Sequence, residues 1–244
     1  MDKDAFELAK NKILRDDRFR HGIGTLSEKT LHAILKLYYG PDTDMHEVPI
    51  ENYVADIYNG ERIIEIQTHD LGRLRGKLEA YLKEYMVTVV YPIPRESKLI
   101  WLNAETGEKE RSRKSPHKGN VYEAFIELYR IIGFLKNPNL EIRILLLDIE
   151  EYRLLEKTKR GRRKSSRHDR IPVEVCDEVI IRRYEDYRMF IPIELGDEFN
   201  SEEFAKAAGI HRDLARSVLS LLFKIGILER KDRNKSGYIY AVIE

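Results

Sequence analysis

A basic segment near the middle of the chain constrains the fold more than any other feature of the sequence. Residues 157–170 read KTKRGRRKSSRHDR, with eight Lys or Arg residues and one Asp. Because this stretch lacks large apolar side chains, it cannot contribute to a hydrophobic core. We therefore expect an exposed loop or linker here, with a folded domain on each side of it.

The length of the chain agrees with a division into two domains. It has 244 residues, of which 42% are hydrophobic, and this is enough apolar material for cores of ordinary size. We expect a first domain at residues 1–155, a basic connector at residues 156–189, and a smaller domain at residues 190–244.

The charge balance excludes one class of nucleic-acid-binding protein. The 43 Lys and Arg residues nearly equal the 42 Asp and Glu residues, which gives a net charge of +1. The chain is therefore not a polycation that coats nucleic acid along its whole length. Positive charge is instead concentrated in the basic segment, which carries +7.

The single cysteine and the lack of long apolar runs indicate the compartment. Cys176 has no second cysteine with which to form an internal disulfide, which indicates a reducing compartment and excludes thiol clusters and cysteine-ligated zinc sites. No apolar run approaches the roughly 20 residues that span a bilayer, and the N-terminus lacks the apolar stretch of a signal peptide. We expect a cytoplasmic protein with no membrane partner.

Helical and extended patterns alternate ahead of the basic segment. Apolar residues recur at helical spacing in residues 26–40, 69–85 and 121–136. Extended patterns occupy a hairpin at residues 52–68 and strands at residues 87–94, 98–103 and 141–154. Such alternation predicts an α/β domain of about 150 residues.

The hairpin allows its geometry to be derived. Asn59-Gly60 is a strong signal for a two-residue type I′ turn, which needs positive φ at both positions. Such a turn sets three cross-strand pairs: Tyr58 with Glu61, Asp56 with Ile63, and Val54 with Glu65. Since side chains alternate between faces, Asp56, Glu65 and Gln67 would share one face. The opposite face would be the core face, with Ala55, Ile57, Ile64 and Ile66.

Asp56 and Glu65 would be diagonal neighbours across this hairpin. Diagonal Cβ atoms lie about 7–8 Å apart or somewhat less, so the two carboxylates are able to converge on a cation. Mg²⁺ suits one or two carboxylates together with waters and phosphate oxygens. The alternative is that both acids are solvated residues on the exposed side of an antiparallel pair.

Two short motifs around this hairpin occur together in one group of nucleases. Residues 27–36 read SEKTLHAILK, and the hairpin continues from Ala55-Asp56 to Ile64-Glu65-Ile66-Gln67. They resemble the E-x-x-x-H-x-x-x-K helix and the A-D…I-E-x-Q segment of the CoiA-like branch of the PD-(D/E)xK nuclease superfamily. The resemblance covers residues 20–95 and implies a restriction-endonuclease-like mixed sheet flanked by helices.

The resemblance also implies a magnesium or manganese site and hydrolysis of DNA phosphodiester bonds. Asp56 and Glu65 would be metal ligands, together with the backbone carbonyl of Ile66. Glu28 would be an additional ligand or act through water. Gln67 stands where the superfamily more often has lysine, so it would orient water without adding charge. Lys77, or Arg73 one helical turn before it, is a candidate for the missing cation.

Several of these residues also have purely structural interpretations. Glu28 follows Thr25 by three residues, so it would complete a capping box. His32 and Lys36 continue a helical stripe from Glu28, in which His32 would be a packing histidine. Arg73 and Lys77 would then be only the solvated face of their helix.

The last part of the chain resembles a winged helix-turn-helix. A supporting helix is expected at residues 202–208, with Asn200 as its N-cap and Glu203 three residues on, followed by a turn at Ala208-Gly209. A recognition helix is expected at residues 212–225, and then a hairpin with its wing at residues 231–237. Such modules insert the second helix in the major groove. The candidate DNA contacts of this module are His211, Arg212, Arg216, Lys231, Arg233 and Lys235. Those of the basic segment are Arg160, Arg162, Arg163, Lys164 and Arg167, which would contact phosphates.

The function that these observations favour is a metal-dependent DNA nuclease with a winged-helix DNA-binding module. Two alternatives remain open: a non-catalytic DNA-binding regulator built on a nuclease-like fold, and a protein-interaction adaptor. Winged helices also serve as protein–protein and dimerisation modules, so a homodimer is among the assemblies that the sequence allows.

Overall fold

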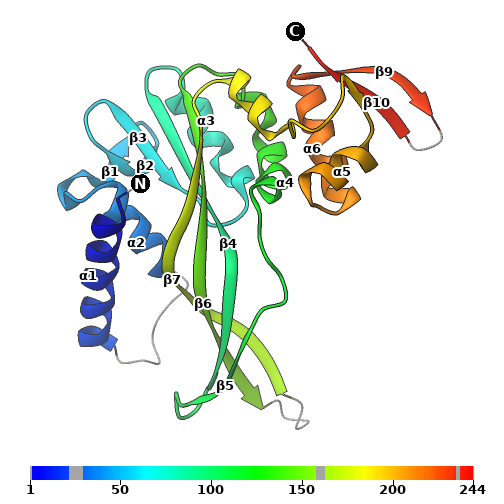
Figure 1. Ribbon diagram of the computed structural model, residues 1–244. Helices are drawn as coiled ribbons and strands as arrows, with labels where there is room; N and C mark the ends of the chain where they lie inside the picture. Colours follow the sequence, from blue (N-terminus) through cyan, green and yellow to red (C-terminus); the bar gives the residue numbers. More distant parts are fainter. Residues whose placement is uncertain (1, 22–29, 158–162, 235–236, 244) are drawn as a thin grey trace. The chain divides into compact units, whose positions relative to one another are not determined.

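The computed structural model describes residues 2–21, 30–157, 163–234 and 237–243 (Figure 1). The chain forms two compact units, and each comprises three segments. The first unit contains Met1–Thr68, Val90–Asn120 and Ile144–Val179. The second contains His69–Val89, Val121–Arg143 and Ile180–Glu244. None of the described helices is long and apolar enough to cross a membrane.

The architecture is α/β, with a large mixed sheet flanked by helices. Its strand order is β1-β2-β3-β4-β6-β7, and β5 pairs with β4. The strands are β1 His46–Ile50, β2 Tyr53–Tyr58, β3 Arg62–Ile66, β4 Met86–Asn103, β5 Lys109–Lys114, β6 Leu140–Lys157 and β7 Arg163–Ile181. The three longest strands, β4, β6 and β7, contribute residues to both units.

The helices of the first unit are α1 (Lys3–His21) and α2 (Thr30–Tyr39), followed by the 3₁₀ turn η1 (Thr43–Met45). Helix α2 buries Leu31, Ile34 and Leu35, as its helical spacing requires. These side chains join one core with Phe6 of α1, Ile57 of β2, and Ile64 and Ile66 of β3. The helix predicted at residues 26–40 is confirmed from Thr30 onward, and residues 22–29, including Glu28, lie outside the described residues.

The second unit combines short helices with a three-stranded sheet of order β8-β10-β9. Its helical elements are η2 Leu71–Leu74, α3 Arg75–Tyr81, η3 Val121–Glu123, α4 Ala124–Leu128, η4 Tyr129–Phe134, η5 Tyr184–Phe190, α5 Ser201–Ala208 and α6 Arg212–Lys224. Its small sheet contains β8 Glu198–Phe199, β9 Leu228–Asn234 and β10 Gly237–Val242. Aromatic rings fill its core, with the rings of Phe125 and Phe190 4.9 Å apart and edge to face.

The C-terminal helices begin and end within one residue of their predicted bounds. The Asn200 side chain accepts hydrogen bonds from the N–H groups of Glu202 and Glu203, and Glu203 returns one to the Asn200 N–H, so the capping box is confirmed. Gly209 has a φ of 64° and ends α5 in the left-handed conformation. The expected hairpin after α6 is also confirmed, as β9 and β10.

The basic segment differs from its prediction. The part of it at residues 163–170 belongs to β7, so the expectation of an exposed loop is wrong there, while residues 158–162 lie outside the described residues. Asp169 and Arg170 are buried in this strand, and Arg167 pairs with Glu151 of β6. Partners from the neighbouring strand therefore allow charged residues to occupy the sheet.

Three local predictions also change at their boundaries. The strands expected at residues 87–94 and 98–103 are one continuous strand, β4. The helix expected at residues 69–85 is shorter and comprises η2 and α3. The helix expected at residues 121–136 is divided among η3, α4 and η4.

The aromatic core of the second unit provides a stability test. Phe125 is fully buried, whereas its neighbour Ile126 is 53% exposed on the same helix. Phe125→Ala should lower the free energy of unfolding by about 3–5 kcal/mol, because it leaves a cavity among the rings. Ile126→Ala is the matched control and should change it by less than about 0.5 kcal/mol. Chemical denaturation followed by circular dichroism measures both, and equal effects would contradict this packing.

Candidate functional site

The turn between β2 and β3 comprises residues 59–61 rather than Asn59 and Gly60 alone. Ile57 pairs with Ile64 and Tyr58 with Ile63, and β3 begins at Arg62. Asn59 Oδ1 accepts hydrogen bonds from the N–H groups of Glu61 and Arg62, at 3.1 and 2.8 Å. Of the loop residues only Gly60 has positive φ, so the predicted type I′ turn is wrong. The Asn59 side chain organises the turn in its place.

The new register keeps the two carboxylates on one face of the hairpin. The predicted pairing of Asp56 with Ile63 and of Val54 with Glu65 is wrong by two residues. Because a shift of two leaves every side chain on its original face, the observed register, continued by one residue, sets Asp56 opposite Glu65. Opposed Cβ atoms lie about 4.5–5.5 Å apart, closer than the diagonal arrangement that we expected.

Asp56 is held in place by two donors from different elements. The Ile66 N–H of β3 donates to Asp56 Oδ2 at 2.8 Å. His32 Nε2 of α2 lies 3.2 Å from the same oxygen, and the Asp56 side chain is 16% exposed. The carboxylate therefore has a defined position before any ligand arrives.

His32 is a residue that the sequence pointed to only weakly. It lies on the stripe of Glu28, His32 and Lys36, which a packing histidine would also explain. The structure brings His32 to Asp56, while Lys36 pairs with Glu47 of β1. His32 and Lys36 therefore contact different acids.

Glu65 occupies a deeper position than expected. It is 1% exposed, and its neighbours Ile63, Ile64 and Ile66 in β3 are also buried. The alternative that both acids lie on a solvated strand face is therefore wrong for Glu65. A carboxylate buried this far from water is costly unless it is paired, hydrogen-bonded or bound to a cation. Polar groups must therefore surround the Glu65 carboxylate.

The remaining predicted residues are distributed over both units. Gln67 directly follows β3, is half-buried, and donates its N–H to the Val90 carbonyl of β4 at 3.0 Å. Arg73 and Lys77 belong to η2 and α3 of the second unit. The roles of Glu28, Lys77 and the Ile66 carbonyl stay predictions.

The two carboxylates of this hairpin are its candidate metal ligands. Over the described ranges no group of three or more His, Cys, Asp and Glu side chains is arranged to hold a metal. Mg²⁺ keeps several waters and needs only one or two carboxylates. Asp56 and Glu65 supply two carboxylates, and a metal site at them stays a prediction.

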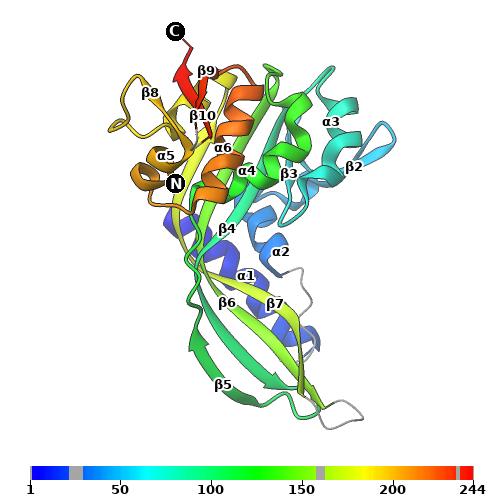
Figure 2. The same cartoon turned by 90° about the vertical axis from the view of Figure 1, so that its right-hand side faces the viewer.

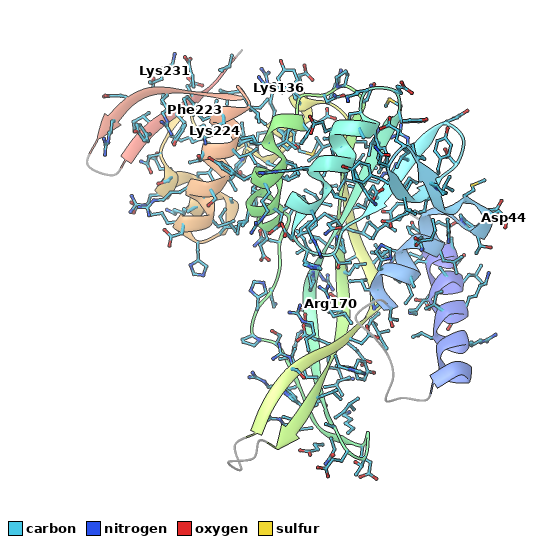
Figure 3. The ribbon with its side chains drawn as sticks, turned by 180° about the vertical axis from the view of Figure 1, so that it is seen from behind. Asp44, Lys136, Arg170, Phe223, Lys224 and Lys231 are labelled. Carbon is cyan, nitrogen blue, oxygen red and sulfur yellow. The ribbon has the colours of Figure 1, made fainter. Side chains whose placement is uncertain are left out.

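The predicted DNA contacts of the C-terminal helices mostly have acidic neighbours. Arg212 lies 3.5 Å from Glu202, and Arg216 lies 2.9 Å from Asp213. Lys231 of β9 (Figure 3) lies 2.6 Å from Glu229, whose hydrogen bond raises the pKa of Lys231. His211 is exposed at the start of α6, and Arg233 lies over the Tyr238 ring.

Some predicted contacts cannot be compared with the structure. Arg160, Arg162 and Lys235 lie outside the described residues. Arg163 and Lys164 begin strand β7.

Arg230 was not predicted at all. Its guanidinium carbon lies 4.2 Å from the centroid of the Phe223 ring and 3.8 Å from that of the Tyr238 ring. The alternation of Tyr238 and Tyr240 in the sequence was a signal that would have pointed to this cluster.

A family model described as "Domain of unknown function (DUF8091)" matches residues 29–182. The chain belongs to the DUF8091 family. The matched range contains His32, Asp56, Glu65 and Gln67 and ends directly after β7. The DUF8091 match therefore includes the whole described carboxylate site and excludes η5, α5, α6 and the small sheet.

One relative of this DUF8091 protein comes from Treponema pallidum (strain Nichols). It bears the name "Uncharacterized protein" and is 33% identical over 146 residues. The match spans 59% of this chain and 58% of the relative, so it extends over less than two thirds of either protein. No solved structure matches the chain.

The role of Asp56 in joining the two strands can be tested without any ligand. Asp56→Ala should lower the free energy of unfolding by about 1–3 kcal/mol, because it removes the acceptor of the N–H of the buried residue Ile66. Asp56→Asn keeps an acceptor oxygen and should lower it less. Asp44→Ala, at an exposed acid of the same unit, is the control and should have little effect. Urea denaturation compares all three, and no loss in Asp56→Ala would contradict the geometry.

Proposed function

We propose that this protein is a metal-dependent DNA nuclease that hydrolyses phosphodiester bonds, with a C-terminal winged-helix module that binds DNA. The observation that carries the proposal is the fixed carboxylate of Asp56, held by the Ile66 N–H and by His32. Glu65 occupies the neighbouring position on β3. Two acids held at one point favour a bound cation, because it relieves their mutual repulsion.

Each residue of the site has a distinct part in this proposal. Asp56 and Glu65 supply hard carboxylate oxygens, and Ile66 supplies its carbonyl. His32 orients Asp56 as a positioning residue. The Gln67 amide orients the attacking water but adds no charge. A bound Mg²⁺ or Mn²⁺ would acidify that water and stabilise the charge on the phosphate.

The order of elements supports the same proposal. Helix α2 precedes β2, which carries Asp56; β3 carries Glu65, and Gln67 follows it directly ahead of η2 and α3. This is the order that the PD-(D/E)xK resemblance implies. In the sheet, β3 lies between β2 and β4, so the two acids are on inner strands. Glu28 as a further ligand and Lys77 as a helix cation are parts of the proposal that mutagenesis can test separately.

The C-terminal elements support a DNA-binding module. Helices α5 and α6 are joined through Gly209, and the hairpin of β9 and β10 follows α6 in the manner of a wing. Helix α6 buries Ala215, Val218 and Leu222 and leaves Arg216 exposed near its start. The exposed side of its first turns is thus available to a DNA groove.

The enzyme proposal predicts cleavage that depends on a divalent metal. With Mg²⁺ or Mn²⁺ the protein should cut DNA, and EDTA should stop it. Asp56→Asn and Glu65→Gln should abolish cleavage, because each neutralises a ligand while it keeps the side chain's shape. His32→Ala should lower the rate about 10–100-fold, as loss of a ligand's hydrogen-bond partner does. Gel assays on single- and double-stranded DNA measure these rates.

Two variants complete this test. Lys77→Ala should cause a large loss if a helix lysine compensates for Gln67, and Glu28→Gln should cause one if Glu28 is a ligand. Lys98→Ala, which removes a lysine paired with Glu150, is the control and should leave the rate unchanged. If the wild-type protein binds DNA but cuts neither form, the enzyme proposal fails and the non-catalytic regulator is favoured.

The module proposal predicts weaker DNA binding when the start of α6 loses its charge. The double variant Arg212→Ala/Arg216→Ala should bind a duplex less tightly and with a smaller salt dependence, because fewer counterions are released. Lys206→Ala, at an exposed lysine of α5, is the control. A salt titration followed by fluorescence anisotropy of a labelled duplex measures both. Unchanged affinity in the double variant would leave α5 and α6 as a protein-contact module.

A further inference from the structure

The strands β4, β5, β6 and β7 carry a group of arginines on one face within the first unit. Figure 2 shows β5 in the lower part of the view, beside the ends of β4 and β6 and the start of β7. In the β4–β5 pair, Leu99 is opposite Arg113 and Trp101 is opposite Arg111. Opposed residues share a face, so these four side chains lie together.

Trp101 is the centre of this face. It is 4% exposed and packs with Leu99 and Leu155. The guanidinium carbons of Arg111 and Arg113 lie 4.3 and 5.7 Å from the centroid of its ring, so arginines rather than apolar side chains lie over the indole. Its Nε1 donates to Ser165 Oγ of β7 at 3.2 Å, which links β4 to β7 across β6.

Two further arginines share one acid on the same face. Glu151, Arg153 and Leu155 alternate along β6, and Leu155 packs against Trp101. Glu151 is 8% exposed and pairs with both Arg153, at 2.6 Å, and Arg167 of β7, at 3.4 Å. The Glu151 carboxylate is therefore shared by two guanidinium groups. We call Arg111, Arg113, Arg153 and Arg167 the arginine face.

The opposite face of the same strands is different. Lys114 pairs with Glu96 at 2.6 Å and lowers its pKa, and Lys98 pairs with Glu150 at 2.8 Å. In the described part of the chain, by contrast, neither Arg111 nor Arg113 has a carboxylate within ion-pair distance. If the arginines served only to keep the edge strand β5 from aggregating, the face on which they lie would not matter. Two arginines on one face without a carboxylate partner among the described residues indicate an anionic partner.

We propose that the arginine face binds the phosphodiester backbone of DNA. This inference rests on the proposed function, and it adds a substrate-binding surface to the carboxylate site. Arginine recognises phosphate through two parallel N–H donors. The cation–π contacts with Trp101 restrain Arg111 and Arg113, which reduces the ordering cost of binding a phosphate. Such contacts are independent of sequence.

Trp101 is a positioning residue in this proposal. At 4% exposure it cannot stack on a base, unlike the aromatic platforms of single-strand binders. It is also the one tryptophan of the sequence. Its fluorescence therefore reports directly on this face and separates binding here from binding through α6.

The test uses the full chain in EDTA, so that binding is measured without cleavage. A 20-base-pair duplex, and one strand of it, are titrated while Trp101 emission and the anisotropy of a labelled oligonucleotide are followed. We expect the emission to change on binding. Arg111→Ala/Arg113→Ala should weaken binding at least about tenfold, and should reduce the slope of log K against log salt by about 1.8, at 0.9 for each lost phosphate contact.

The matched control removes the same charge from the opposite face of the same two strands. Lys98→Ala/Lys114→Ala should keep both the affinity and the salt slope. Arg111→Lys/Arg113→Lys keeps the charge but loses the paired donors, so it should bind with intermediate affinity. It also guards against misfolding of the alanine variant, which circular dichroism checks.

Three results would overturn the proposal: equal losses in the alanine variants of both faces, no loss in the arginine variant, or equally tight binding of poly-glutamate, which would show a general polyanion surface. The test also separates failure of the arginine-face proposal from failure of the nuclease proposal. Cleavage that persists with unchanged binding in the arginine variant would remove this surface alone. Binding that depends on Arg111 and Arg113 without any metal-dependent cleavage would remove the nuclease alone.

Discussion

The hydrogen bond from the Ile66 N–H to the Asp56 carboxylate is the contact on which the proposed site depends. It joins β2 to β3 through a side chain, beyond the backbone pairs Ile57–Ile64 and Tyr58–Ile63. His32 reaches the same oxygen from α2, so a helix and two strands meet at one carboxylate. A backbone donor and an imidazole both favour a charged acceptor. The contacts that stabilise this part of the first unit therefore also fix the orientation of the Asp56 carboxylate.

The sequence was most informative where structure is decided locally. The Asn200 capping box and the Gly209 helix end depend on residues three or fewer positions apart or on one backbone angle, and both are confirmed. The hairpin shows the limit of such reasoning. Asn59 organises the loop through its side chain instead of a left-handed backbone, and the dipeptide alone does not distinguish these two uses. The shared face of Asp56 and Glu65 was nevertheless predictable, because the register error was an even number of residues.

Long-range pairing explains what composition could not predict. Residues 163–170 look like a solvated run of charge, yet they form part of β7 because β6 provides acids such as Glu151. Strand formation depends on the neighbouring strand more than on intrinsic propensity, and that neighbour is not visible in the run itself. The burial of Glu65 has the same origin, since it follows from packing on both sides of β3. His32 was visible as a stripe residue, but its contact with Asp56 requires the fold.

The segmented units have a consequence for how the chain is made. The first unit includes Ile144–Val179, and the second includes Ile180–Glu244 as well as two earlier segments. During synthesis, the first unit therefore cannot close until about three quarters of the chain has left the ribosome, and β4 must wait for β6 and β7. Late closure of distant strands is slow and leaves apolar edges exposed. Nascent-chain folding of this protein should therefore depend on chaperones until residue 179 has emerged, and cutting the gene at a single point will not release an intact unit.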